Sequence, residues 1–378
     1  MTVVISGIAF LALLTLLVIV HEFGHYLAAV WSRVRVEEFG FGIPPRAMKL
    51  FSYKETLFSL NYIPFGGFVR LQGENSLDPN ERERAGSFAA ASIPARLFIL
   101  VAGVCMNLLV AVLLFTFGFW LWNWVPTYLT LDELRGGEAR GEVQVDWSLY
   151  ISEVVDGAPA ATAGIKEGGV LTAVDGTPVT SVDEVLGLQE GKRLVTYTVK
   201  YPETNGGEEF AEEETVKVNL KDGKAGVALS PFALDLHVSD RSFFTGVTLA
   251  LRETWTVTVG TVKGVGVLLK SLAFEQRVPP DIAGIVGIAQ LTYTSVQEGF
   301  MKYLRLVALL SLSLAVLNIL PFPALDGGRI LFVAYELLLR RPVNRRVEVI
   351  TNGVGIALIM ALMVAVTWND ILRILSSS

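Results

Sequence analysis

The pattern of charged and apolar positions along the chain is dominated by long stretches that contain no charge. No Asp, Glu, Lys or Arg precedes Glu22, and three further stretches of comparable length occur later. An α-helix rises about 1.5 Å per residue, so about 20 apolar residues cross the roughly 30 Å hydrocarbon layer of a bilayer. The pattern therefore predicts four membrane-spanning helices, at residues 3–30, 97–124, 305–325 and 349–369.

A short segment after the first predicted span alternates apolar and polar residues instead. In the sequence FSLNY, from Phe58 to Tyr62, the alternation has a period of two, which is typical of a half-buried β-strand. The sequence PFGG then predicts a turn, and FVRLQG predicts a second strand. We expect a β-hairpin at about residues 55–72, at or in the cytoplasmic face of the membrane. A ribbon without a functional role is the alternative.

Residues 148–231 have the composition of a small soluble domain. The segments LYISEVV and VLTAVDGTPV predict strands, the second with a turn at Asp175-Gly176, and APAATAGI and SVDEVLGLQ predict short helices. LVTYTVKY and EETVKVNL predict a strand pair joined through the glycine-rich ETNGG. This compact α+β module resembles a PDZ domain, although Gly169 stands where that family usually has Asp after a glycine.

The region from 240 to 298 follows neither pattern. Residues 242–275 mix aromatic and aliphatic side chains with Arg252, Lys263 and Lys270, which favours a helix lying on the outer membrane surface. The sequence DIAGIVGIAQLTYTSV is apolar and rich in glycine but short for a membrane span. We expect this second segment to dip into the membrane or to lie at its surface.

Composition supports the membrane assignment, because 52% of the 378 residues are hydrophobic and only 18% are charged. The predicted fold class is a polytopic α-helical membrane protein with a membrane-associated β-hairpin and an inserted α+β PDZ-like domain. Its parts are 1–125 with two spans, 148–231, 240–298, and 299–378 with two more spans. A net charge of −6 argues against a nucleic-acid partner, and the single cysteine, Cys105, excludes an intramolecular disulfide.

The distribution of basic residues predicts the orientation in the membrane. Nine Lys or Arg lie between the first two predicted spans, and the sequence RRPVNRR precedes the fourth. Both segments should be cytoplasmic, which places both termini and residues 126–304 outside. A cleaved signal peptide is the alternative for the first span, but that span has no basic start and no small-residue cleavage site.

The sequence HEFGH, near the end of the first predicted span, is an H-E-x-x-H motif. Its histidines, His21 and His25, lie about 40° apart around a helix, so both can reach one metal ion. The intervening Glu22 acts in such sites as a general base on water. Two imidazoles and a carboxylate in an apolar helix are costly unless they are paired, which favours a functional metal site over a chance match.

A catalytic zinc ion needs a third protein ligand and one open position. The one further histidine, His237, belongs to the predicted outer region, so the third ligand should be an acid or Cys105. Asp326 follows the third span in NILPFPALDGGRI, where two prolines interrupt the helix and let the carboxylate turn inward. Counting the spans places Asp326 at the same membrane depth as His21 and His25, whereas in isolation it could simply begin the next loop.

These motifs together resemble the site-2 protease family of intramembrane zinc metalloproteases, of the RseP type (regulator of sigma-E protease). HEFGH is similar to the zinc helix of the family, and NILPFPALDGG to its Asn-x-x-Pro-x-x-x-Leu-Asp-Gly motif. IPFGGFVRLQGE is similar to its membrane-associated β-loop, and GVCMN to its Gly-x-x-x-Asn element. The chain departs from the family in having one PDZ-like module where some members have two, and Ile285 where a Gly-Pro pair is usual.

The resemblance implies roles for individual residues. His21, His25 and Asp326 would bind Zn²⁺, and Glu22 would activate water. Asn318 would hydrogen-bond the substrate backbone beside the metal, or alternatively form a helix–helix hydrogen bond.

Two further sets of residues are implied near the substrate. Asn107, like Asn318, would hydrogen-bond the substrate backbone. Alternatively, it would support close helix packing together with Gly103. Leu60, Asn61 and Gly67 of the predicted hairpin would offer strand-edge groups that accept an unwound substrate segment by β-addition.

The implied activity is zinc-dependent cleavage of membrane-spanning segments in single-pass membrane proteins, within the lipid bilayer of a bacterial inner membrane. The active site would lie toward the cytoplasm, and the substrate could be an anti-sigma factor or a remnant signal peptide. The PDZ-like module could bind a freed C-terminus. Two alternatives from other classes are a membrane metal transporter, which would need a polar path through both leaflets, and a PDZ adaptor with a plain membrane anchor.

Overall fold

The computed structural model describes residues 2–74, 76, 78–202, 210–275, 277–279, 282–341 and 343–376. They form two compact units, which are described separately. The helical unit comprises Met1–Thr127 and Arg241–Ser378, and the sheet unit comprises Tyr128–Asp240. The glycine-rich segment 203–207, predicted to join two strands, lies outside the described residues.

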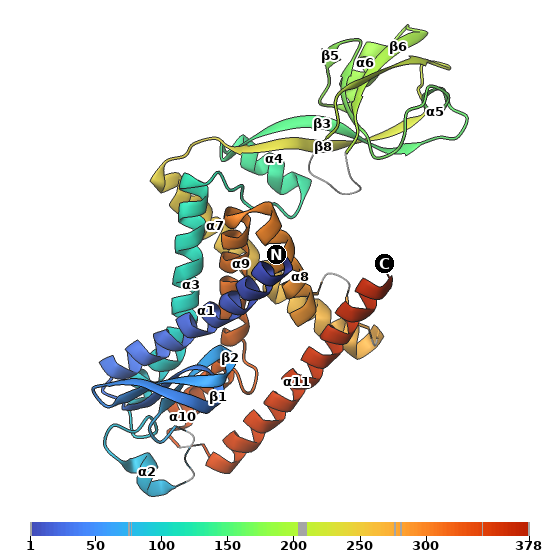
Figure 1. Ribbon diagram of the computed structural model, residues 1–378. Helices are drawn as coiled ribbons and strands as arrows, with labels where there is room; N and C mark the ends of the chain where they lie inside the picture. Colours follow the sequence, from blue (N-terminus) through green and yellow to red (C-terminus); the bar gives the residue numbers. More distant parts are fainter. Residues whose placement is uncertain are drawn as a thin grey trace. The chain divides into compact units, whose positions relative to one another are not determined.

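Long apolar helices build the helical unit (Figure 1). They are α1 (Thr2–Trp31), α3 (Ile93–Leu121), α7 (Phe243–Lys270), α9 (Phe300–Ile319) and α11 (Arg345–Ser376). Among the described residues these five are long and apolar enough to cross a membrane, if α7 is taken with the π-helical turn Ser271–Glu275 that continues it. The chain therefore has the helices of a multi-pass membrane protein.

The five candidate spans exceed the predicted four, and α7 is the additional one. Its mean hydropathy is 1.4, below the 1.8 to 3.0 of the other four, because charged residues interrupt it. One of these, Glu253, is fully buried and accepts hydrogen bonds from the backbone amide and the hydroxyl of Thr127, both at 2.7 Å. That α7 lies on the outer membrane surface stays a prediction.

The helices α1, α3 and α9 pack directly against one another and form the centre of the helical unit. α3 begins after Ser92, with Pro94 in its first turn, where a missing amide costs no intrahelical hydrogen bond. Gly24 of α1 permits the close approach, because a Cβ there would lie 2.4 Å from the Ala102 carbonyl oxygen of α3. Buried apolar side chains of α1 and α9 fill their interface: Leu13, Leu17, Leu306 and Val307.

Three shorter helices complete the helical unit. They are α2 (Pro79–Glu83), α8 (Ile285–Glu298) and α10 (Asp326–Leu339). α8 occupies the short glycine-rich apolar segment and packs against α1, α9 and α11. The fully buried Asp370 of α11 caps the N-terminus of α8. Its carboxylate accepts hydrogen bonds from the backbone amides of Gly284 at 2.9 Å and Gly287 at 2.8 Å.

Replacing Asp370 by Ala should therefore lower the thermal stability of the purified protein. The change leaves two amides without their acceptor, at a cost of about 1–3 kcal/mol. The midpoint of thermal unfolding, followed by tryptophan fluorescence, measures this. Asp370→Asn keeps one acceptor oxygen and should lose less, and Asp156→Ala, at an exposed position, should change nothing. Equal midpoints for Asp370→Ala and the unchanged protein would contradict the capping role.

The strands β1 (Val36–Tyr53) and β2 (Thr56–Leu71) are each bent and form a sheet with more than two rows. The first half of β1, Val36–Phe41, pairs on one side with Gly67–Leu71 and on the other with Leu57–Leu60. The second half of β1 pairs again with the first half of β2, and the chain reverses at Lys54-Glu55. The bidentate ion pair of Glu38 with Arg46, at 2.6–2.8 Å, ties the two halves of β1 together.

This arrangement corrects the predicted hairpin in one respect. The two segments expected to pair through the PFGG turn, Phe58–Tyr62 and Phe68–Leu71, are separated by Val36–Phe41. The prediction was wrong because the strand in VEEFGFGIPPR was not recognised. Glycine rather than a polar residue alternates with its apolar side chains there, and two prolines follow. The sheet packs on the end of α1 through Tyr26, whose ring lies 5.8 Å from those of Phe39 and Phe58.

The sheet unit is a six-stranded antiparallel sheet with three short helices. Its elements are α4 (Leu131–Ala139), β3 (Val143–Val154), α5 (Pro159–Thr162), β4 (Val170–Val174), β5 (Thr177–Pro178), α6 (Val182–Gln189), β6 (Leu194–Lys200), β7 (Glu214–Asn219) and β8 (Val227–Val238). The strand order is β7-β6-β4-β3-β8, with β5 paired to β4. A single apolar core includes Leu149, Leu171 and Tyr197, all fully buried.

The predicted strands and helices of this region are confirmed, including the turn at Asp175-Gly176, where both residues have positive φ. The unit extends beyond the predicted limits of 148 and 231, because β3 and β8 pair along their whole length from Val143 to Val154. The outer part of this ribbon does alternate apolar and polar residues, in VQVDW and LDLHV, so the prediction missed an available signal there. α6 begins with a capping box, in which Ser181 and Glu184 each bond the other's backbone amide.

Candidate active site

The two histidines of α1 meet on one face of the helix, as the i, i+4 spacing predicts. Their Nε2 atoms lie 3.1 Å apart, and the rings cross at 86°. Both side chains are buried, with His21 at 7% and His25 at 9% exposure. Gly103 of α3 makes room for them, because a Cβ there would lie 2.5 Å from His25 Nε2 and 2.8 Å from His21 Cε1.

A break between α9 and α10 brings Asp326 to the histidines. α9 ends at Ile319, and Pro321 and Pro323 prevent its continuation, as predicted. α10 then begins at Asp326, whose Oδ2 lies 2.9 Å from His21 Nε2 and 3.3 Å from His25 Nε2. Residues more than 300 positions apart thus converge on one point.

The three converging atoms fit a zinc ion. Tetrahedral ligands at about 2.0 Å from zinc lie about 3.3 Å from one another, close to the 2.9–3.3 Å separations of this site. The buried Asp326 Oδ2 has no hydrogen-bond donor among the described residues, as expected for an oxygen that faces a metal. The donor set of two imidazoles and one carboxylate is typical of a catalytic zinc with one open position. His21, His25 and Asp326 can therefore hold Zn²⁺.

The ring of His25 is oriented by α3. Its Nδ1 lies 2.8 Å from the carbonyl oxygen of Ile99. A carbonyl can only accept, so the proton of the neutral ring is on Nδ1 and the lone pair of Nε2 points at the site. Such a partner behind a ligating histidine is a usual feature of zinc sites.

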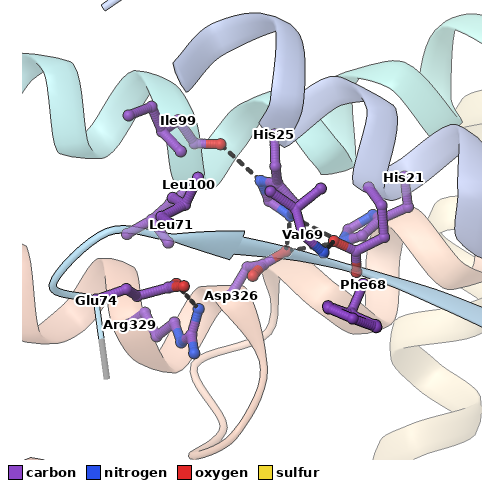
Figure 2. A pocket seen from close by; sticks show the side chains of 11 residues that line it. His21, His25, Phe68, Val69, Leu71, Glu74, Ile99, Leu100, Asp326 and Arg329 are labelled. Carbon is purple, nitrogen blue, oxygen red and sulfur yellow. Dashed lines mark hydrogen bonds and ion pairs between the residues drawn. The ribbon is translucent and has the colours of Figure 1, made fainter. Parts of the chain in front are cut away.

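A hollow of about 190 Å³ opens beside the three atoms (Figure 2). Glu22 lines it together with Phe68, Val69 and Leu71 of the edge segment Gly67–Leu71 of β2. The Val69 amide donates to Glu22 Oε2 at 3.0 Å. The Glu22 carboxylate is thereby held at the hollow rather than at the metal position. Glu74 and Arg329 also line the hollow and form an ion pair, and Arg329 lies one helical turn after Asp326.

A second hollow, of about 270 Å³, shares His21, Glu22 and Asp326 with the first. Asn318 lines it, near the end of α9. The structure thus brings Asn318 to the site, on the side away from the sheet. Its implied contact with substrate backbone stays a prediction.

The remaining predicted residues are placed differently. Asn107 is fully buried on α3, lines neither hollow and lies with its side-chain amide 3.4 Å from His21 Nδ1. Leu60 pairs with both Phe41 and Met48, so it lies in an interior row and offers no free edge. Asn61 is likewise turned inward, and its amide donates to the carbonyls of Phe41 and Gly42. The prediction that Leu60 and Asn61 present edge groups was therefore wrong.

Gly67 does lie on the edge row, as the first residue of the segment that faces Glu22. Val69, Glu74 and Arg329 were not predicted to be near the site. The first two could not be placed because the sheet pairing was unknown, whereas the third had a signal, since it follows Asp326 by one helical turn.

Another cluster with suitable ligand atoms occurs in the sheet unit, formed by Asp146, Asp235 and His237. All three side chains are exposed, and Asp235 forms an ion pair with His237 at 3.1 Å.

The site combines an H-E-x-x-H helix with an aspartate that follows a helix break, and it lies within a bundle of long apolar helices. These features define the class of the protein as a membrane metallohydrolase. The chain belongs to peptidase family M50, whose family model matches residues 9–362. This confirms the predicted resemblance to the site-2 proteases and the requirement for zinc.

Individual relatives align with this chain over nearly their whole length. A protein of Agrobacterium fabrum named "Putative zinc metalloprotease" is 29% identical over 96% of this chain and 95% of its own length. Another of the same name, from Clostridium perfringens, is 29% identical over 98% of this chain and 99% of its own. The zinc metalloprotease RasP of Shouchella clausii is 26% identical over 98% and 99%.

Proposed function

We propose that the protein is an intramembrane zinc endopeptidase that cleaves the membrane-spanning segments of single-pass membrane proteins. The observation that carries the proposal is the convergence of His21 Nε2, His25 Nε2 and Asp326 Oδ2 beside Glu22, at positions within or directly after long apolar helices. Ionisable groups inside such helices are functional by default, because they are costly to keep there.

The residues divide the chemistry between them. His21, His25 and Asp326 hold the zinc ion, which supplies Lewis-acid chemistry when bound. Glu22 takes a proton from the attacking water and returns it to the amine that leaves when the peptide bond breaks. The Val69 amide keeps one oxygen of Glu22 occupied, so the other is free to face the water.

The edge segment Gly67–Leu71 supports a mode of substrate binding. A helical substrate has its carbonyls and amides engaged with one another, so it must unwind before the scissile bond is accessible. An unwound segment could pair with the edge of β2 by β-addition, directly beside Glu22. Asn318, on the far side of the zinc ligands, could then bond the substrate backbone.

The proposal includes an orientation. Basic residues concentrate between α1 and α3 and before α11, which supports a cytoplasmic position for these segments in a bacterial inner membrane. Both termini and the sheet unit would then be outside. Anti-sigma factors and remnant signal peptides are substrates of the required kind, since each has one short membrane-spanning segment.

The sheet unit would act as a PDZ-like module that binds a freed C-terminus. β8 is the last strand of the sheet order and has a free edge among the described strands, and α6 packs near it. Val182 and Leu186 on one face of α6 are exposed and apolar. Such an edge beside an apolar helix face suits an extended peptide.

Helix-breaking residues in a substrate segment should raise its rate of cleavage. Unwinding costs less when Gly or Pro replaces Leu near the scissile bond, since these residues cost about 1 and 3 kcal/mol in a helix interior. The measurement compares initial rates for one segment with and without these changes, and we expect a severalfold increase. Equal rates for both segments would contradict binding as an extended strand.

The proposed function itself is tested by metal analysis and peptide hydrolysis on the same purified protein. We expect about one zinc per chain and hydrolysis of a membrane-spanning peptide. A metal transporter would bind zinc without cutting, and an adaptor would do neither. Either result would refute the proposal.

A further inference from the structure

We propose that Asn107 is a positioning residue for the zinc site, which acts by accepting the Nδ1 proton of His21, and that it does not contact substrate. The proposal rests on the zinc site of the preceding section. The side-chain amide of Asn107 lies 3.4 Å from His21 Nδ1, and its side chain is fully buried. Its Oδ1 has no hydrogen-bond partner among the described residues, which is costly for a buried oxygen.

The position of the metal decides which ring nitrogen of His21 carries the proton. Nε2 faces His25 and Asp326, so Nε2 is the metal-binding atom. The neutral ring then has its proton on Nδ1, which must find an acceptor behind the ring. An NH₂ group facing that N–H would place two donors opposite each other.

A half-turn of the Asn107 amide removes this conflict. It exchanges the positions of Oδ1 and Nδ2, so that Oδ1 accepts from His21 Nδ1. The same turn gives Oδ1 a partner and moves Nδ2 to the buried position that Oδ1 occupied. His21 then matches His25, whose Nδ1 donates to the Ile99 carbonyl on the same helix. α3 thus supplies one acceptor to each zinc-binding histidine.

Two neighbours fix the position of Asn107 relative to the histidine rings. The fully buried Ser311 of α9 donates to the Asn107 backbone carbonyl at 2.9 Å, which fixes α3 against α9. Gly103, one turn earlier on α3, lets both rings lie over the helix backbone. The sequence GVCMN therefore combines space for the rings, at Gly103, with an acceptor for one of them, at Asn107.

The experiment measures zinc affinity of the full-length protein by competition with a chromophoric chelator, alongside cleavage. Asn107→Leu keeps the size of the side chain and removes the acceptor, so its zinc affinity should fall about 10- to 100-fold. Asn107→Asp retains an acceptor oxygen at the same place and should restore affinity to within about threefold of the unchanged protein. In the Co²⁺-substituted protein, the visible spectrum of Asn107→Leu should shift, since the ring of a ligand is no longer oriented.

Asn318→Leu is the matched control, an amide removed from the other side of the same site. It should retain zinc affinity while its KM for substrate rises. The inference is overturned if Asn107→Leu binds zinc normally, or if Asn107→Asp loses zinc as fully as Asn107→Leu, which would indicate helix packing alone. If the unchanged protein binds no zinc, the proposed function fails instead, and the two failures are distinguishable.

Discussion

Replacing Glu22 by Gln should abolish cleavage while the purified protein still carries its zinc. Gln has the size of Glu but cannot accept a proton, and loss of a general base lowers the rate by at least about 10²-fold. The three zinc-binding atoms are untouched, and the Val69 amide can still donate to the remaining carbonyl oxygen. Measurement of kcat and of zinc content on one preparation tests both parts of the expectation.

The control for this variant is Glu74→Gln, a second carboxylate on the wall of the same hollow. It weakens the ion pair with Arg329 but removes no base, so its rate should fall far less than that of Glu22→Gln. Cleavage at an undiminished rate in Glu22→Gln would show that another group activates the water. Loss of zinc from Glu22→Gln would show that Glu22 is a ligand.

Replacing Asp326 by Ala should remove the zinc itself, and cleavage with it. The change leaves two ligands, His21 and His25, which is too few for a catalytic zinc site. Zinc affinity should fall more than when a hydrogen-bond partner of a zinc ligand is removed, which costs about 10- to 100-fold. Zinc affinity by chelator competition and zinc content after dialysis are the measurements.

Asp235→Ala provides the matched control, because Asp235 belongs to the exposed cluster of the sheet unit. It should leave zinc content and cleavage unchanged. If Asp326→Ala retained full zinc occupancy, a different third ligand would have to exist. If Asp235→Ala lost the zinc, the metal would be bound in the sheet unit instead.

The zinc-binding residues could be predicted because each half of the site has a local signature. His21 and His25 follow helical periodicity in an uninterrupted apolar stretch, so their shared face needed no tertiary information. Asp326 follows two prolines at the end of another apolar stretch, and such prolines end a helix in any fold. The predicted four spans placed the two halves at one depth, and the structure brings their ligand atoms together, whereas the number of spans stays a prediction.

The sheet could not be predicted to the same degree. The alternation at Phe58–Tyr62 identified a strand correctly, but the residues that pair with it begin at Val36, where glycine and proline obscure the pattern. Register depends on these partners, so edge groups were predicted at Leu60, Asn61 and Gly67. Of these three, only Gly67 belongs to the edge segment Gly67–Leu71 that lies beside Glu22. Long-range pairing is information that a local pattern does not contain.

Asn107 illustrates a different limit. A buried amide in an apolar helix is equally consistent with a substrate contact and with a packing contact, because both need only a polar group at that position. The choice depends on what lies on the next helix, and here His21 lies 3.4 Å away.

The fifth apolar helix, α7, was assigned to the membrane surface because of its charged residues. Its length of 28 residues is also sufficient for a span.

The most direct test of zinc-dependent intramembrane cleavage is to map the cut bond. The full-length protein and a single-pass membrane protein are reconstituted together in liposomes, and the products are analysed by mass spectrometry. We expect a cut within the apolar membrane-spanning segment, lost after zinc removal by a chelator, restored by added Zn²⁺ and absent in Glu22→Gln. A cut only in the soluble tails of the substrate, or a cut within the segment that persists in zinc-free Glu22→Gln protein, would contradict this expectation.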